Sequence, residues 1–242
     1  TWTSDFTFSK NNEEIVELTN GSDRDLGNLW FVGSPIKVWY DYKKVGIWQL
    51  GEEAEALKYG QKPGDIKVLD VNKDGKIDAT NDRIIVGTPR PKYSLGFNNK
   101  IAYKGFDLSA FLYARVGQTI MSEASGNYKI SGLENGPKVD YWTPENPTNA
   151  HPRPDKNKNS NSAYMSTLYY VDGSFLKIRD ITIGYSVPSY LLDRIGISKV
   201  RLYSTFNNFF TFSKMKPYDP ERGGSISFPM TRQVVFGVNV SF

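Results

Sequence analysis

The side chains best suited to chemistry lie in one acidic stretch, DVNKDGKID, which runs from Asp70 to Asp78. Oxygen-bearing residues recur there at every second position, and a glycine follows them where a sharp turn is needed. This spacing is typical of an EF-hand-type calcium loop, in which alternating side-chain oxygens and one backbone carbonyl face the ion. The predicted ligands are Asp70, Asn72, Asp74, the carbonyl of Lys76, Asp78 and Asp82.

The end of this loop departs from the calcium pattern. The twelfth position is Asn81 rather than an acid, and the acid follows one residue later at Asp82. Polar loops of this composition also form successive Asx turns that need no ion. The sequence therefore leaves a calcium-bound loop and an ion-free loop open. In both, the loop has a structural role and no catalytic one.

The chain lacks the residues that common catalytic sites require. Its 242 residues include no cysteine and a single histidine, His151, which lies in a polar loop. Ser/His and Cys/His catalysis therefore have little support. The acids of residues 52–55 fall on the surface of a short predicted helix over 52–59, and Gly223–Ser225 lacks the strand and helix of a phosphate loop. We predict that the protein is not an enzyme.

The elements that must position these residues are predicted to be strands. In the final stretch, RQVVFGVNVSF, apolar side chains occupy every second position from Val234 to Phe242. A strand of this length with one apolar face suits either a bilayer-crossing strand of a barrel or a strand of a soluble sandwich. About eight such segments are expected from the same alternation. They cover residues 2–9, 15–18, 34–48, 91–103, 106–115, 175–187, 198–210 and 232–242.

The connections between these strands are unequal. Short turns are expected at residues 11–12, 104–105 and 188–196, whereas residues 51–91, 118–171 and 213–230 are long insertions. Outer-membrane barrels have short periplasmic turns and long extracellular loops. The mean hydropathy of −0.47 does not oppose this, because only alternate residues face lipid. We predict an all-β fold, an antiparallel transmembrane β-barrel segment, whose strands could close a small barrel or form one arc of a larger wall. Because the chain starts in mid-strand without a Met or a signal segment, we expect it to be a piece of a larger protein.

Aromatic residues make up 14% of the chain. Most are expected in the girdles where amphipathic rings lie at the level of lipid headgroups. Tyr141, Trp142 and Tyr164 are predicted instead to contact a ligand or a lid, because they lie in a long loop on the expected extracellular side. The 30 Lys and Arg residues are scattered among 26 Asp and Glu residues, so nucleic-acid binding is not expected.

Several stretches, taken in order, resemble the C-terminal part of SusC/RagA-type TonB-dependent outer-membrane transporters of Bacteroidetes-like bacteria. They are GSPIKVWYDYKKVGIWQ (33–49), PGDIKVLDVNKDGKIDATNDRIIVG (63–87), PKYSLGFNNKIAYKGFDLSAFL (91–112), YWTPENPTNAHPRP (141–154), YVDGSFLKIRDITIGYSVP (170–188), IGISKVRLYSTFNNFFTFSK (195–214) and VVFGVNVSF (234–242). No single stretch is diagnostic, but their order and spacing are specific.

The resemblance implies a barrel of about 22 strands, filled by a plug domain encoded upstream of Thr1. It also implies a SusD-like surface lipoprotein as a lid and import of glycans or oligopeptides, driven through TonB, across the outer membrane of a Gram-negative bacterium. Residues 1–242 would be the C-terminal part of that barrel, in contact with outer-membrane lipid. Two alternatives remain from the sequence: a soluble calcium-dependent carbohydrate-binding β-sandwich and a small passive pore.

Overall fold

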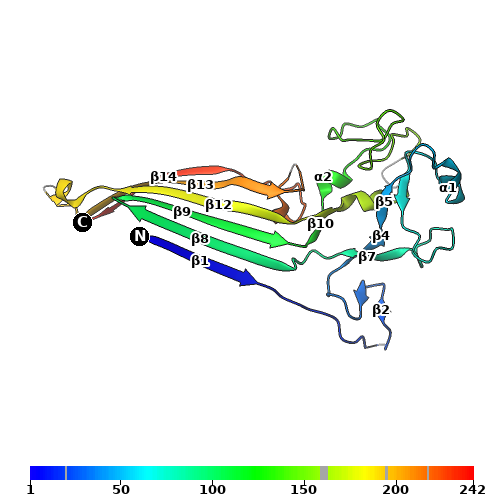
Figure 1. Cartoon of the computed structure of the whole chain (residues 1–242), viewed down its shortest axis with the longest axis horizontal. Coiled ribbons are helices and arrows are strands. Elements are labelled where there is room, and N and C mark those ends of the chain that lie inside the picture. The colour runs from blue at the N-terminus through cyan, green and yellow to red at the C-terminus, as the bar shows by residue number, and fades with distance from the viewer. Residues whose placement is uncertain (20, 159–162, 194–195, 217) are drawn as a thin grey trace.

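A computed structural model of the chain describes residues 1–19, 21–158, 163–193, 196–216 and 218–242. Within these ranges, six long strands form one antiparallel sheet in the order β1-β8-β9-β12-β13-β14 (Figure 1). This confirms the predicted all-β antiparallel fold. The sheet is open, because β1 pairs only with β8 and β14 only with β13. The strands are β1 (Trp2–Ser9), β8 (Tyr93–Tyr103), β9 (Phe106–Val116), β12 (Phe175–Ser186), β13 (Lys199–Ser213) and β14 (Gln233–Ser241).

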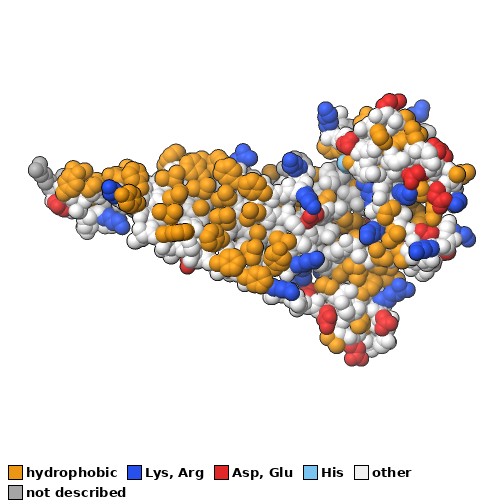
Figure 2. All heavy atoms as spheres, in the orientation of Figure 1, with side chains coloured by type: hydrophobic (Ala, Val, Ile, Leu, Met, Phe, Trp, Pro, Cys, Tyr) orange, Lys and Arg blue, Asp and Glu red, His pale blue; other side chains and the backbone are white. Residues whose placement is uncertain are grey.

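One face of this sheet is apolar across its whole width. A representative row, read from paired residues on β1 to β13, is Phe6, Phe97, Leu112, Ile178 and Phe210. Hydrophobic side chains cover much of the visible face of the long sheet in Figure 2. In the part of the chain that is described, no second sheet packs on this face, and Phe6 is 66% exposed. A patch of this size suits lipid rather than water, which argues against the soluble sandwich.

The opposite face is polar and carries charges. The matching row there is Thr7, Gly96, Tyr113, Lys177 and Thr211. A β-bulge at Arg179 adds one residue to β12 between Ile178 and Asp180. β13 also has extra residues at this level of the sheet. Beyond the bulge the strands pair again in line, so that Ile181 and Phe206 lie on the apolar face. The predicted division into an apolar face and a polar face is therefore confirmed along the sheet, and we call the polar face the inner face.

Two of the expected sheet strands are not in the sheet. Residues 15–18 form only an isolated bridge, between Ile15 and Val32, and residues 34–48 form the short strands β4 (Trp39–Tyr42) and β5 (Lys44–Ile47) elsewhere. The sheet therefore has six strands in the described ranges rather than about eight. The reason is that β1 pairs directly with β8, so residues 11–12 do not close a hairpin. Alternation predicts a strand but not which sheet it joins.

Most of the remaining elements form a head at the end of the sheet away from both termini, whereas the 3₁₀ turn Ser189–Leu191, between β12 and β13, lies at the opposite end (Figure 1). Residues 10–92 and 117–174 supply most of the head. Its short strands pair as β2–β3, β4–β7, β5–β6 and β10–β11, and among the described residues no helix is long and apolar enough to cross a membrane. The other elements are β2 (Arg24–Asp25), β3 (Trp30–Phe31), α1 (Glu53–Lys58), β6 (Ile66–Val68), β7 (Arg83–Gly87), β10 (Thr119–Met121), α2 (Glu123–Gly126), β11 (Tyr170–Asp172) and the 3₁₀ turns Met165–Tyr169, Ser189–Leu191 and Pro220–Arg222.

Candidate functional site

The head has a hydrophobic core of its own, to which both long segments contribute. Trp142 is only 4% exposed, and its indole nitrogen donates a hydrogen bond of 2.8 Å to the side-chain oxygen of Gln49. The buried hydroxyl of Tyr128 donates to the carbonyl of Pro152. Because the two segments share this core, they fold as one unit. The core residues are Ile47, Ile66, Val68, Tyr128, Ile130, Trp142, Met165 and Leu168.

The three predicted ligand-contact aromatics occupy different environments. Trp142 is a core residue, so its ring is not available for stacking on a ligand in this conformation. Tyr164 is half-buried and meets the ring of Tyr42 edge-on at 5.0 Å. Tyr141 is 42% exposed and keeps its prediction as a ligand or lid contact. The sequence could not separate neighbouring Tyr141 and Trp142, because nothing in an irregular loop shows which ring points inward.

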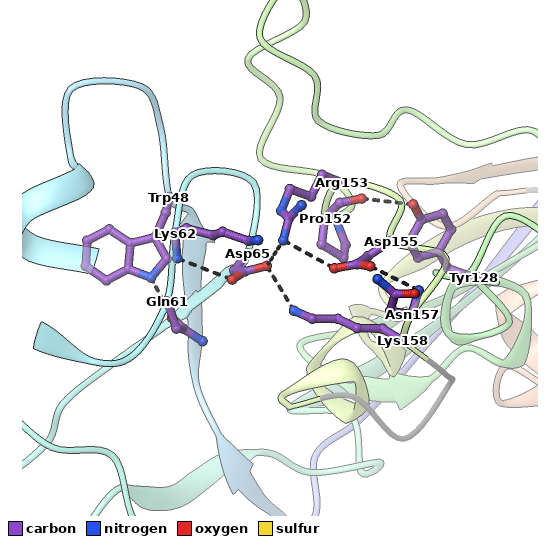
Figure 3. Close-up of polar contacts among 10 residues, drawn as sticks. All are labelled: Trp48, Gln61, Lys62, Asp65, Tyr128, Pro152, Arg153, Asp155, Asn157 and Lys158. Atoms are coloured by element: carbon purple, nitrogen blue, oxygen red, sulfur yellow. Dashed lines mark hydrogen bonds and ion pairs between the residues drawn. The ribbon is translucent and has the colours of Figure 1, made fainter. Parts of the chain in front are cut away.

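A polar network fastens the two head segments together (Figure 3). Asp65, from the first segment, lies between Arg153 and Lys158 of the second, with nitrogen–oxygen distances of 3.4 and 3.1 Å. Beside it, the Arg153 backbone N–H donates to the carbonyl of Gly64. Gly64 has a φ of +86°, and a Cβ there would lie 2.6 Å from the Trp142 ring. Only glycine permits both this backbone conformation and this approach.

The acidic loop is held in shape by its own carboxylates. Asp70 accepts hydrogen bonds from the backbone N–H groups of Lys73 and Gly75, at 2.6 and 2.9 Å. Asp82 is fully buried and accepts from the N–H groups of Val71 and Asp78, both at 2.8 Å. Asp82 therefore closes the loop by joining its two ends. This is the main role that the structure gives to the predicted last ligand.

The middle of the acidic loop is built from Asx turns. The Asp74 carboxylate accepts from the Lys76 N–H and from the Asn72 side chain. Hydrogen bonds from Asn81 hold the pKa of Asp78 below its ordinary value. In the ranges described, no three acidic or histidine side chains form a group that could hold a metal ion. The Asx-turn alternative accounts for these contacts, and calcium binding stays a prediction.

The inner face of the sheet carries a charged pair that the sequence alone did not reveal. Arg201 on β13 reaches across β12 and donates two hydrogen bonds to Asp107 on β9, at 2.9 and 2.6 Å. The residue between them is Gly184, where a Cβ would lie 2.5 Å from an Arg201 guanidinium nitrogen. The pair could be found only with the strand register, since the three residues are far apart in sequence.

A second charged cluster joins the inner face to the β13–β14 connection. We call residues 218–232 of this connection the strap. Lys177 on β12 is fully buried and lies 2.5 Å from Asp219 and 2.9 Å from Glu221, both on the strap. Arg179 also pairs with Glu221. Burial alone would raise the pKa of Glu221, but hydrogen bonds from Lys177 and Arg179 outweigh it and hold that pKa below its ordinary value.

A cavity of about 660 Å³ lies where the head meets the sheet. Its lining includes Tyr42 and Lys44 from the head and Lys92 and Tyr93 at the start of β8. Lys44 donates to the carbonyls of Asn149 and Ala150, at 2.8 and 2.6 Å, and burial lowers its pKa to about 8. Neutral carbonyls compensate a buried ammonium less well than a carboxylate does, and among the cited contacts of Lys44 there is no carboxylate to raise this pKa again.

Curated relatives match the chain along its whole length. TonB-dependent receptor P3 of Formosa agariphila is 29% identical over 277 residues, which cover 100% of this chain and 27% of that protein. TonB-dependent receptor SusC of Bacteroides thetaiotaomicron is 27% identical over 255 residues, which cover 24% of its length. The chain thus spans about a quarter of the length of the curated relatives it matches. No family model matches the chain.

Solved structures also match this chain, in fold. The RagAB peptide importer in its "open-open" state superposes on the whole chain with a TM-score of 0.74 and 22% identity, over 26% of the length of that chain. Its "closed-closed" state gives the same TM-score with 23% identity. Sequence and fold together support one assignment: the chain is SusC/RagA-like over its whole length and is related to the TonB-dependent receptors.

Proposed function

We propose that the chain forms part of the wall and mouth of an outer-membrane TonB-dependent transporter, which imports glycans or oligopeptides together with a SusD-like surface lipoprotein. The observation that carries this proposal is the two-faced sheet. One face is predominantly apolar and exposed, and the other carries Asp107, Lys177 and Arg201. A wall between lipid and an aqueous interior requires this division.

The position of the head supports the assignment of one end of the sheet as extracellular and the other as periplasmic. It is built from the two long segments and lies at one end of the sheet, whereas the short turn at Lys104–Gly105 and both termini lie at the other (Figure 1). Long connections are typical of the extracellular end of outer-membrane barrels. In this arrangement the head faces incoming ligand and the lipoprotein lid, and Tyr141 is the exposed aromatic best placed among the predicted contacts.

The ligand class is supported by the relatives. The RagAB structures are described as a peptide importer or transporter, which supports oligopeptides for this chain. SusC of Bacteroides thetaiotaomicron is described as a TonB-dependent receptor. Glycans stay within the proposal because the exposed aromatic rings of the head suit stacking on sugars as well as on peptide side chains.

The test is a fractionation of the native protein from its source bacterium. We expect the full-length protein in the outer membrane, released by detergent but not by salt or plain buffer, with a surface lipoprotein that co-purifies in a constant ratio. A strain that lacks the gene should lose growth on one oligopeptide or glycan source and keep growth on monomers. Full solubility in plain buffer would refute the proposal.

A further inference from the structure

The strap is seated on the head as well as on the sheet. The backbone N–H of Glu123, in α2, donates to the carbonyl of Gly224, and the Ile226 N–H donates to the Glu123 carboxylate, both at 3.0 Å. A Cβ at Gly224 would lie 2.0 Å from the carbonyl oxygen of Met121, so the two backbones are in close contact. The strap therefore bridges the inner face of the sheet and the head at the proposed mouth.

The cations and the acids of this cluster come from different parts of the chain. The wall supplies two cations, Lys177 and Arg179, and the strap supplies the two acids, Asp219 and Glu221. Among the ion pairs of the described residues, these two cations pair with strap acids alone. The Lys177 side chain is 0% exposed, and a buried cation without a counter-charge is strongly unfavourable. If the strap lifts, the wall needs another anion.

The wall around these cations is organised without help from the strap. The Arg179 guanidinium lies over the Tyr113 ring, 4.4 Å from its centroid, and Arg115 lies near the same ring at 5.5 Å. Arg115 also donates to the Tyr113 hydroxyl at 2.8 Å. Stacking on an aromatic ring orients a guanidinium and leaves its N–H groups free to bind carboxylate or sulfate oxygens.

We propose that Lys177 and Arg179 form an anion-binding site in the inner wall, which the strap fills with its own Asp219 and Glu221 and which takes the carboxylate or sulfate groups of an acidic ligand when the strap lifts. This inference rests on the proposed transport function and assigns acidic oligomers to it as a ligand class. The same donors cannot serve both anions, so a ligand that binds them shifts the strap toward its lifted position.

Because the strap belongs to the same chain as the wall, its acids stay close to the two cations, and this determines the concentration at which a ligand can displace them. The strap acids are held close to the wall at an effective concentration in the millimolar range or above. A single anion must exceed that concentration to displace them. An oligomer with several acids can engage both cations at once, so it should compete at far lower concentrations.

The experiment follows strap movement in the purified full-length transporter in detergent. A single cysteine replaces the exposed Ser227, in a background without other cysteines, and carries an environment-sensitive fluorophore. The probes are pentaglutamate, pentaglutamine, monomeric glutamate and NaCl at matched ionic strength. We expect a saturable emission change with pentaglutamate, half-complete at a concentration at least tenfold below that for glutamate, and no change with pentaglutamine.

Variants separate the site from general effects on folding. Glu221→Gln weakens the hold of the strap and leaves the wall cations intact, so the half-effect concentration of pentaglutamate should fall at least threefold. Glu134→Gln, which removes an exposed ion pair with Lys129 in the head, is the matched control and should leave it unchanged. Lys177→Gln should abolish the response.

Three outcomes would overturn the site: no response to pentaglutamate, an equal response to matched NaCl, or an unchanged half-effect in Glu221→Gln. Because the readout is movement of the strap in isolated protein, any of these outcomes leaves the transport proposal to its own test by fractionation and growth.

Discussion

Gly184 lies under the Arg201–Asp107 pair, and replacing it with alanine should break that pair. The new Cβ would lie 2.5 Å from an Arg201 nitrogen and 2.6 Å from an Asp107 oxygen, whereas ordinary contacts begin at 3.4 Å. Both groups must move by roughly 1 Å, and because the contacted atoms are the ends of side chains, the cost is the loss of the pair's geometry rather than overpacking of a core. A bidentate charge-assisted pair cannot keep its geometry through such a shift.

The size of the effect follows from two opposing contributions. A charge-assisted hydrogen-bonded pair contributes about 1.5–3 kcal/mol, and this pair is partly exposed, at 22% and 15% of its side chains, so the lower part of that range applies. Alanine offsets about 0.5–1 kcal/mol, because glycine is unfavourable inside a strand. We expect Gly184→Ala to destabilise the sheet by about 1 kcal/mol.

Gly96→Ala is the matched control. Gly96 also lies on the inner face, in the middle of β8, but its added Cβ would meet Phe111 at 3.4 Å, an ordinary contact. The assay is the temperature at which the folded full-length protein converts to the unfolded band on unboiled gels. Gly184→Ala should lower that temperature, and Gly96→Ala should leave it unchanged or raise it.

The pair also allows a test by mutant cycle. In an Asp107→Ala background Arg201 has no partner to lose and can move away from the new Cβ. Gly184→Ala should therefore be neutral or slightly stabilising there. If Gly184→Ala lowers the transition temperature equally with and without Asp107, or no more than Gly96→Ala does, the reasoning from the Cβ contacts is wrong.

Three further predictions concern other parts of the chain. Phe236→Arg, on the apolar face, should cost about 2–4 kcal/mol at mid-bilayer depth, whereas Asn239→Arg, on the inner face, should be much milder; equal losses of folded protein in outer membranes would contradict the facing of β14. Burial lowers the pKa of His151, so the folded head favours the neutral ring, and its stability should be lost as the pH falls below 6.5; limited proteolysis of the head should increase at pH 5, and His151→Gln should reduce that increase. If the acidic loop binds calcium, 2 mM Ca²⁺ should protect it from proteolysis relative to EGTA, and Asp74→Asn should remove the protection; protection that is identical in both proteins would leave the ion-free loop as the answer.

The hairpin of β8 and β9 shows how much the sequence can predict. Two long alternating runs flank Lys104–Gly105, and the structure pairs them as expected, with positive φ at both turn residues. Local pairing of this kind depends on turn chemistry and a period of two, which are both visible in the sequence. The facing of the residues on β8 and β9 follows from the same alternation, whereas on β12 the bulge at Arg179 changes which residues face each side.

Features that depend on contacts distant in sequence could not be predicted. The run at 34–48 alternates like a sheet strand, but it forms β4 and β5 in the head because β1 and β8 already pair with each other. The burial of Trp142 depends on Gln49 and Gly64, which come from another segment. Lys177 looks like an ordinary inner-face lysine until the strap places two acids over it. In each case the deciding neighbour lies in a different long segment.

The direct pairing of β1 with β8 has a consequence for how the protein is made. Ser9 pairs with Ser94, so this contact closes a loop that contains residues 10–93. The β8–β9 contact closes across only Lys104–Gly105. Long loops close at a larger entropic cost and more slowly than tight hairpins. The tight β8–β9 hairpin should therefore form before β1 pairs with β8, so that β1 and the first head segment are added late when this part of the sheet is built.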